Sequence, residues 1–159
     1  HYPLRRQRQM CIRDRVSPKG QVAIEIFSPD GKLKDKVNIP NLVVQTGRNY
    51  IASRMNDTAQ TAVMTHMAVG SGSVAATLSD TVLGTELTRV ALDSDNTVDN
   101  VITYIATYAP GVGTGAITEA GIFNDAGANL GDLLCRTTFL VVNKAVDDSM
   151  VITWTITIS

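Results

Sequence analysis

Only a few side chains in this 159-residue chain could carry chemistry. Beyond the first fifteen residues there is one histidine, His66, and one cysteine, Cys135. A thiol beside an imidazole is the arrangement of a cysteine nucleophile with its general base. Cys135, however, alternates with Leu133 and Phe139 on the apolar face of a predicted strand, and a thiol buried among apolar side chains is inert. We therefore interpret Cys135 as a core residue.

The patterns that bind metals, phosphates or cofactors are incomplete. No group of cysteines and histidines has the spacing of a zinc site. The acidic pairs at 93/95 and 147/148 lack the glycine and the distant glutamate of a calcium loop. The glycines at 70–73 precede no lysine of a phosphate-binding loop, and those at 111–116 depart from the dinucleotide pattern. The sequence therefore predicts no catalytic residue, no metal site, no cofactor and no enzyme activity.

One carboxylate needs a structural explanation. Glu119 lies in an otherwise apolar stretch, where burial of an unpaired charge would be costly. Arg48, Arg89 and Arg136 are the available partners. We predict a buried ion-pair network of Arg48, Arg89 and Glu119 that favours a single packing of the strands.

The elements that must position these residues are short strands. Apolar residues alternate in three segments, 21–27, 133–142 and 150–159, and the last is the most regular. A Ser-Pro-Asp-Gly turn at 28–31 predicts a hairpin between the first segment and 32–38, and 93–96 reads as a further turn. A single short helix is predicted over 47–55. The predicted core comprises Val22, Ile24, Ile26, Ile122, Leu133, Cys135, Phe139, Ile152, Trp154 and Ile156.

Seven to nine such strands, with turn signals every 8–15 residues, predict an all-β fold. The spacing favours an antiparallel β-sandwich or a Greek-key barrel over alternating βαβ units. Frequent threonine and valine agree with this fold class. We place one β domain at 16–159.

Charge is distributed unevenly along the chain. Residues 1–15 contain five arginines and one aspartate; the remaining 9 basic and 14 acidic residues carry a net charge of −5. The acidic remainder offers no footprint for nucleic acid, and no apolar run approaches the roughly 20 residues of a membrane helix. The segment 1–15 resembles translated sequencing-adapter read-through, and we interpret it as an artefact; a disordered basic arm is the alternative.

Five short motifs occur in an order that is similar to a known group of proteins. They lie at 41–48, 67–72, 83–89, 117–123 and 134–139, and the Trp154 strand follows them. This order resembles small virion structural proteins of tailed bacteriophages, of the tail-fibre or tail-collar kind. The resemblance implies a virion protein, assembled in the host cytoplasm, that acts through contacts with other virion proteins and without catalysis. It also implies a homo-oligomer, with a trimer as one option.

Two other functions stay open at this point. A capsid decoration or head-fibre protein belongs to the same structural class. A stand-alone carbohydrate-binding module for host surface glycans belongs to a different class, and would need exposed aromatic rings to stack on sugars. Tyr104 and Tyr108, which share one face of a predicted strand, are the residues that would supply those rings.

Overall fold

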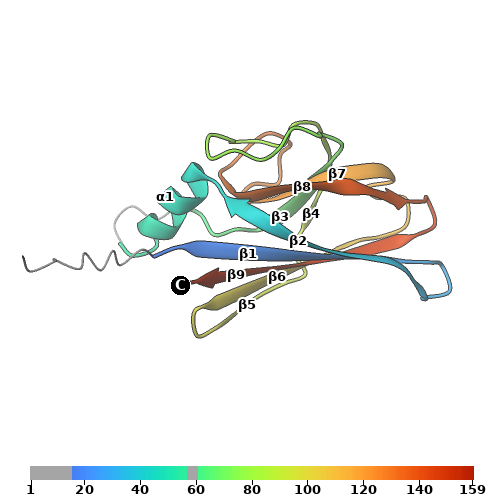
Figure 1. Cartoon of the computed structure of the whole chain (residues 1–159), viewed down its shortest axis with the longest axis horizontal. Coiled ribbons are helices and arrows are strands. Elements are labelled where there is room, and N and C mark those ends of the chain that lie inside the picture. Colours follow the sequence, from blue (N-terminus) through green and yellow to red (C-terminus); the bar gives the residue numbers. More distant parts are fainter. Residues whose placement is uncertain (1–15, 57–60) are drawn as a thin grey trace, which may run out of the picture.

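The computed structural model describes residues 16–56 and 61–159, so the interpretation of residues 1–15 lies outside it. The described residues form nine strands and one helix, α1, which confirms the all-β fold class (Figure 1). The helix begins and ends two residues before its predicted bounds. The elements are β1 (Pro18–Phe27), β2 (Leu33–Val43), α1 (Gln45–Ser53), β3 (His66–Gly70), β4 (Glu86–Ala91), β5 (Ser94–Val98), β6 (Val101–Tyr108), β7 (Gly115–Phe123), β8 (Leu133–Lys144) and β9 (Ser149–Ile158).

All strand pairs are antiparallel and follow the order β4-β3-β7-β8-β2-β1-β9-β6-β5. The sheet curls into two layers, with β7 and β8 in one layer and β1, β9 and β6 in the other (Figure 1). Strand β2 joins the layers, because its first part pairs with β1 whereas Leu42 and Val43 pair with β8. Strand β4 contacts β6 on the other side, so the curled sheet approaches closure.

The core lies between the two layers. Nine of the ten predicted core residues are buried, with at most 2% of their surface exposed. Phe139 is half-buried and packs against the main cluster, whereas Leu133 belongs to a second, smaller cluster with Val44, Ala68, Leu83 and Phe123. Trp154 is central, since β9 runs between β1 and β6 and places the indole opposite Val22 and Tyr104. The strict alternation along β9 reflects burial of one face of this strand, and both of its edges are paired.

An exposed edge strand and the pairing of the two ends of the β structure complete the fold. The predicted turn at 93–96 is wrong, because Ser94–Val98 is strand β5, paired along its length with β6. The two ends of the β structure meet: the backbone N–H of Ser17 donates to the carbonyl of Ser159, and Ser159 donates in return to Ser17. No helix of the described residues is long and apolar enough to cross a membrane.

Candidate functional site

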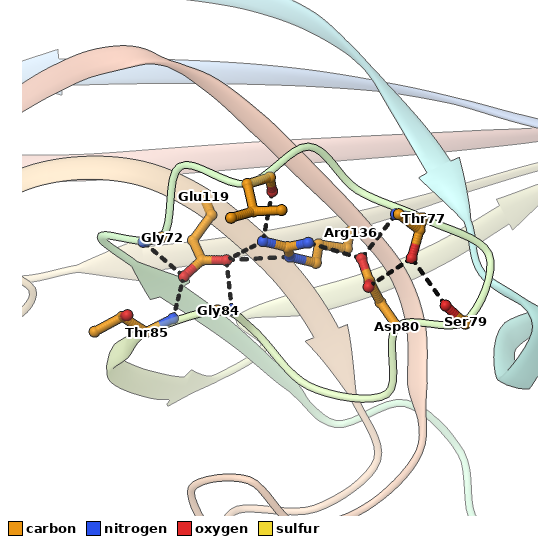
Figure 2. A network of polar contacts seen from close by, with 9 residues as sticks. Gly72, Thr77, Ser79, Asp80, Gly84, Thr85, Glu119 and Arg136 are labelled. Carbon is orange, nitrogen blue, oxygen red and sulfur yellow. Dashed lines mark hydrogen bonds and ion pairs between the residues drawn. The ribbon is translucent and has the colours of Figure 1, made fainter.

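The most elaborate polar arrangement surrounds Glu119, in the middle of β7. Its side chain faces away from the main core, toward the segment between β3 and β4, which we call the 71–85 loop. One carboxylate oxygen, Oε1, accepts hydrogen bonds from the backbone N–H groups of Gly72 (2.8 Å) and Thr85 (2.7 Å). The other, Oε2, accepts from the N–H of Gly84 (2.8 Å). Both ends of the loop are therefore attached to one carboxylate (Figure 2).

Arg136 of β8 completes the arrangement. Its Nε and Nη2 atoms donate to Oε2 of Glu119 at 3.1 and 2.8 Å, and Nη1 donates to Asp80 of the loop at 2.7 Å. Nη2 also reaches the carbonyl of Val74 at 3.0 Å. Asp80 in turn accepts from the backbone N–H and the hydroxyl of Thr77, both at 2.8 Å. Figure 2 shows Arg136 lying between the two carboxylates, so one guanidinium links β7 to the middle of the loop.

This geometry decides what Glu119 can do chemically. The residue is fully buried, and both carboxylate oxygens are occupied by hydrogen-bond donors. Burial alone would raise the pKa of Glu119. The hydrogen bonds from Thr85, Gly84, Arg136 and Gly72 together lower the pKa by more than burial raises it, so the pKa lies below its usual value. A carboxylate that is ionised, saturated and closed to solvent is a poor general acid or base. The arrangement is suited to holding the loop in one conformation.

Only glycine fits at positions 70 and 72, because the carboxylate of Glu119 occupies the space that a side chain would need. A Cβ on Gly72 would collide with Oε1 of Glu119, and a Cβ on Gly70 would meet the same oxygen and the carbonyl of Thr85. Neither glycine has a positive φ angle, so backbone freedom is not the reason for glycine here. The Gly-Ser-Gly-Ser segment therefore lets the main chain approach a buried charge closely.

We predict that Gly72→Ala lowers the free energy of unfolding by ~1–3 kcal/mol, the usual cost of overpacking a well-packed site. The added methyl group must displace Glu119, which cannot move without breaking its other hydrogen bonds. Urea denaturation measures the effect. Ser73→Ala, one residue further along the exposed loop, is the matched control and should stay within about 0.5 kcal/mol of wild type. Equal stability of the two variants would contradict the close approach.

The network also predicts a pH dependence of stability. The pKa values of Glu119 and Asp80 both lie below their usual values. Burial is the largest single effect and raises each pKa, but the hydrogen-bond donors around each carboxylate together lower the pKa by more than burial raises it. Groups with a depressed folded pKa stabilise the protein above their unfolded pKa of roughly 4, and this stabilisation is lost as the pH falls through the folded values. We expect the free energy of unfolding to decrease as the pH falls from about 5 to about 2. Glu119→Gln should make this decrease smaller, and an unchanged slope would contradict the assignment.

The predicted trio of Arg48, Arg89 and Glu119 does not form. Arg48 lies exposed on α1, and its side chain makes no ion pair within the described residues. Glu119 is buried and paired as expected, but its partner is Arg136, the third arginine considered. The β7–β8 hairpin explains the choice, because its register places Gly121 opposite Arg136 and so brings Glu119 to the neighbouring position on the same face. That register was the signal that could have identified the partner.

Arg89 belongs to a second buried ion pair. Its Nε and Nη2 atoms bind the two carboxylate oxygens of Glu86, each at 2.9 Å, and both side chains are at most 4% exposed. Nη1 donates to the carbonyls of Asp125 (2.8 Å) and Leu130 (3.0 Å), and the guanidinium lies 3.7 Å from the ring centre of Phe123. Arg89 thus fastens the turn between β7 and β8 to the edge strand β4.

The remaining sequence candidates lie apart from this network. Cys135 is fully buried, and burial raises the pKa of its thiol well above the usual value, so the thiol stays protonated. His66 begins β3 and its Nδ1 is hydrogen-bonded to Thr65 (2.8 Å). Asp148 forms an ion pair with Lys34, with 2.7 Å between Oδ2 and Nζ. Asp93 accepts a hydrogen bond from the hydroxyl of Thr107, with 2.6 Å between Oδ2 and Oγ1. Within the described ranges, no three His, Cys, Asp or Glu residues are grouped to hold a metal ion.

The tyrosines considered for sugar stacking both face inward. Tyr108 is fully buried, and its hydroxyl donates to the carbonyl of Met67 at 2.7 Å. Tyr104 is 3% exposed. The two rings therefore do not form an exposed stacking platform.

Comparison with known proteins returns no relationship. The chain matches no protein-family model, no curated protein and no solved structure.

Proposed function

We propose that this chain is a structural protein of the bacteriophage virion, belonging to the tail, fibre or baseplate apparatus, which acts by protein–protein assembly and without catalysis. One observation carries the proposal. Four of the five motifs that carry the resemblance contribute directly to the Glu119–Arg136 network: Gly72, Gly84 and Thr85 donate backbone N–H groups to the carboxylate of Glu119, and Arg136 binds it. The residues behind the resemblance thus have a common physical role.

The network supports an assembly role through what it holds. The 71–85 loop has no regular secondary structure, yet its two ends and its centre are attached to buried charges. It presents Val74, Leu78 and Val82 to solvent, with 75%, 44% and 36% of their surface exposed. A surface that is already ordered loses less conformational entropy on binding than a mobile one. A pinned loop with exposed apolar side chains is therefore well suited to contact a neighbouring subunit.

Native mass spectrometry of the purified protein and the identity of the neighbouring genes test the proposal together. A virion component of this kind should form a closed symmetric oligomer, with a trimer as the first expectation, and its gene should stand among capsid, tail or baseplate genes. A monomer encoded among metabolic genes would overturn the proposal. A monomer that binds glycans on an array would favour the stand-alone carbohydrate-binding module.

A further inference from the structure

The layer formed by β2, β1, β9, β6 and β5 has two strand edges that no described strand covers. Strand β2 pairs with β8 only through Leu42 and Val43, so its first part is paired on the β1 side alone. Pro40 has no N–H group to donate to β8, and its carbonyl accepts instead from the hydroxyl of Thr137 (2.8 Å), where the two strands separate. At the opposite margin of the layer, β5 pairs only with β6 (Figure 1). Both edges therefore present main-chain groups to which another strand can pair.

The two edges carry opposite charge. Residues 32–38, which we call the basic edge, contain three lysines and one aspartate, a net charge of +2. Residues 93–99, which we call the acidic edge, contain three aspartates and no basic residue, a net charge of −3. Like charges that face each other across a strand pair are destabilising. The charges therefore oppose pairing of either edge with its own kind and favour pairing of one edge with the other.

The charged side chains of both edges are accessible. All five residues of β5 are exposed, and so are the first four residues of β2. The three lysines, in chain order, form ion pairs with Asp30 (3.5 Å), Asp148 (2.7 Å) and Glu25 (3.5 Å), and 83%, 46% and 48% of their side-chain surfaces are exposed. The first and last of these pairs are exposed on both sides and contribute little, so those two lysines can turn to a new carboxylate. On the acidic edge, Asp95 and Asp99 form no ion pair within the described residues.

We propose that copies of this chain associate edge to edge, with the basic edge of one copy paired to the acidic edge of the next. Main-chain hydrogen bonds extend the layer across the contact, and the opposite charges select the partner edge. Four successive antiparallel pairs separate β2 from β5, so these two strands run in the same direction and pair in parallel in a ring whose axis lies along the strands. The contact is heterologous, because its two sides are different surfaces. Such a contact gives a ring where the rotation closes and a filament where it does not.

The proposal goes beyond the proposed function and does not need it, and charge reversal in the full chain tests it. Lys32→Glu with Lys36→Glu makes both edges acidic, and Asp93→Lys with Asp95→Lys makes both edges basic. We expect each double variant to weaken self-association at least ~tenfold, as measured by sedimentation and native mass spectrometry. An equimolar mixture of the two double variants should associate in one-to-one proportion. The chain with all four substitutions exchanges the two signs and should assemble as the wild type does.

A control variant separates the edges from the overall charge. Lys19→Glu with Arg48→Glu reverses the same number of charges on exposed residues away from both edges, and should leave association unchanged. A wild type that stays monomeric at high concentration would overturn the proposal. So would double variants that associate like the wild type, or a folded fourfold variant that stays dissociated.

Hydrogen exchange of the wild type gives a second measurement, which decides the question even where a variant does not fold. Association at high concentration should protect main-chain amides within 33–39 and 94–98, relative to the dilute protein. Protection confined to other segments would overturn the proposal. An oligomer that is insensitive to these charges would overturn the edge contact while leaving the proposed virion function intact.

Discussion

Glu119→Ala is expected to lower the free energy of unfolding by ~3–5 kcal/mol, because it breaks a buried ion pair from one side. The guanidinium of Arg136, whose side chain is 3% exposed, would keep Asp80 but lose its buried partner. The backbone N–H groups of Gly72, Gly84 and Thr85 would lose their acceptor at the same time. Chemical denaturation and thermal melting should both report the loss.

An exposed ion pair provides the matched control. Oε2 of Glu25 lies 3.5 Å from Nζ of Lys36 on the β1–β2 hairpin, and 27% and 48% of the surfaces of these two side chains are exposed to solvent. Glu25→Ala should therefore change stability by less than about 1 kcal/mol. A melting temperature of Glu119→Ala within about two degrees of wild type would show that the network contributes little, since 3 kcal/mol corresponds to roughly 6–12 °C in a chain of this size.

Arg89→Ala should be comparably destabilising, by ~3–5 kcal/mol, through a separate set of contacts. The variant leaves the buried carboxylate of Glu86 without its bidentate partner and removes the donor to the carbonyls of Asp125 and Leu130. It also removes the cation that lies over the ring of Phe123. Urea denaturation measures the effect, and proteolysis should show earlier cleavage near residues 124–132.

Two further substitutions separate charge from geometry. Arg89→Lys retains the positive charge but cannot bind both oxygens of Glu86 while reaching two carbonyls, so it should recover only part of the lost stability. Arg48→Ala removes an exposed arginine and should leave stability within about 0.5 kcal/mol of wild type. If Arg48→Ala were as damaging as Arg89→Ala, the distinction between these two arginines would be wrong.

The fold class followed from the sequence because burial on one face imposes a period of two on a strand. In β9, Ile152, Trp154 and Ile156 alternate with threonines, and this regularity marks the strand without further information. Strand β5 was missed for the complementary reason. All five residues of Ser94–Val98 are exposed, so the strand is defined by main-chain pairing with β6 and leaves no apolar pattern to read.

The site was only partly predictable. An acidic residue in an apolar segment indicated that Glu119 needed a partner, but the choice among three arginines depends on the register of β7 and β8. The main donors to Glu119 are backbone N–H groups, which every non-proline residue possesses and which no side-chain motif reveals. In the sequence, Gly70 and Gly72 look like ordinary turn glycines. In the structure, their lack of a side chain leaves space for the carboxylate of Glu119.

The reciprocal hydrogen bonds between Ser17 and Ser159 have a practical consequence for engineering. Because these two positions are adjacent, polypeptide entering at one and leaving at the other would emerge from a single point on the surface. The β structure between them could therefore be grafted into an exposed loop of an unrelated carrier protein without separating the strands. A short linker joining the two positions would likewise permit circular permutation, with new ends opened at the β1–β2 turn.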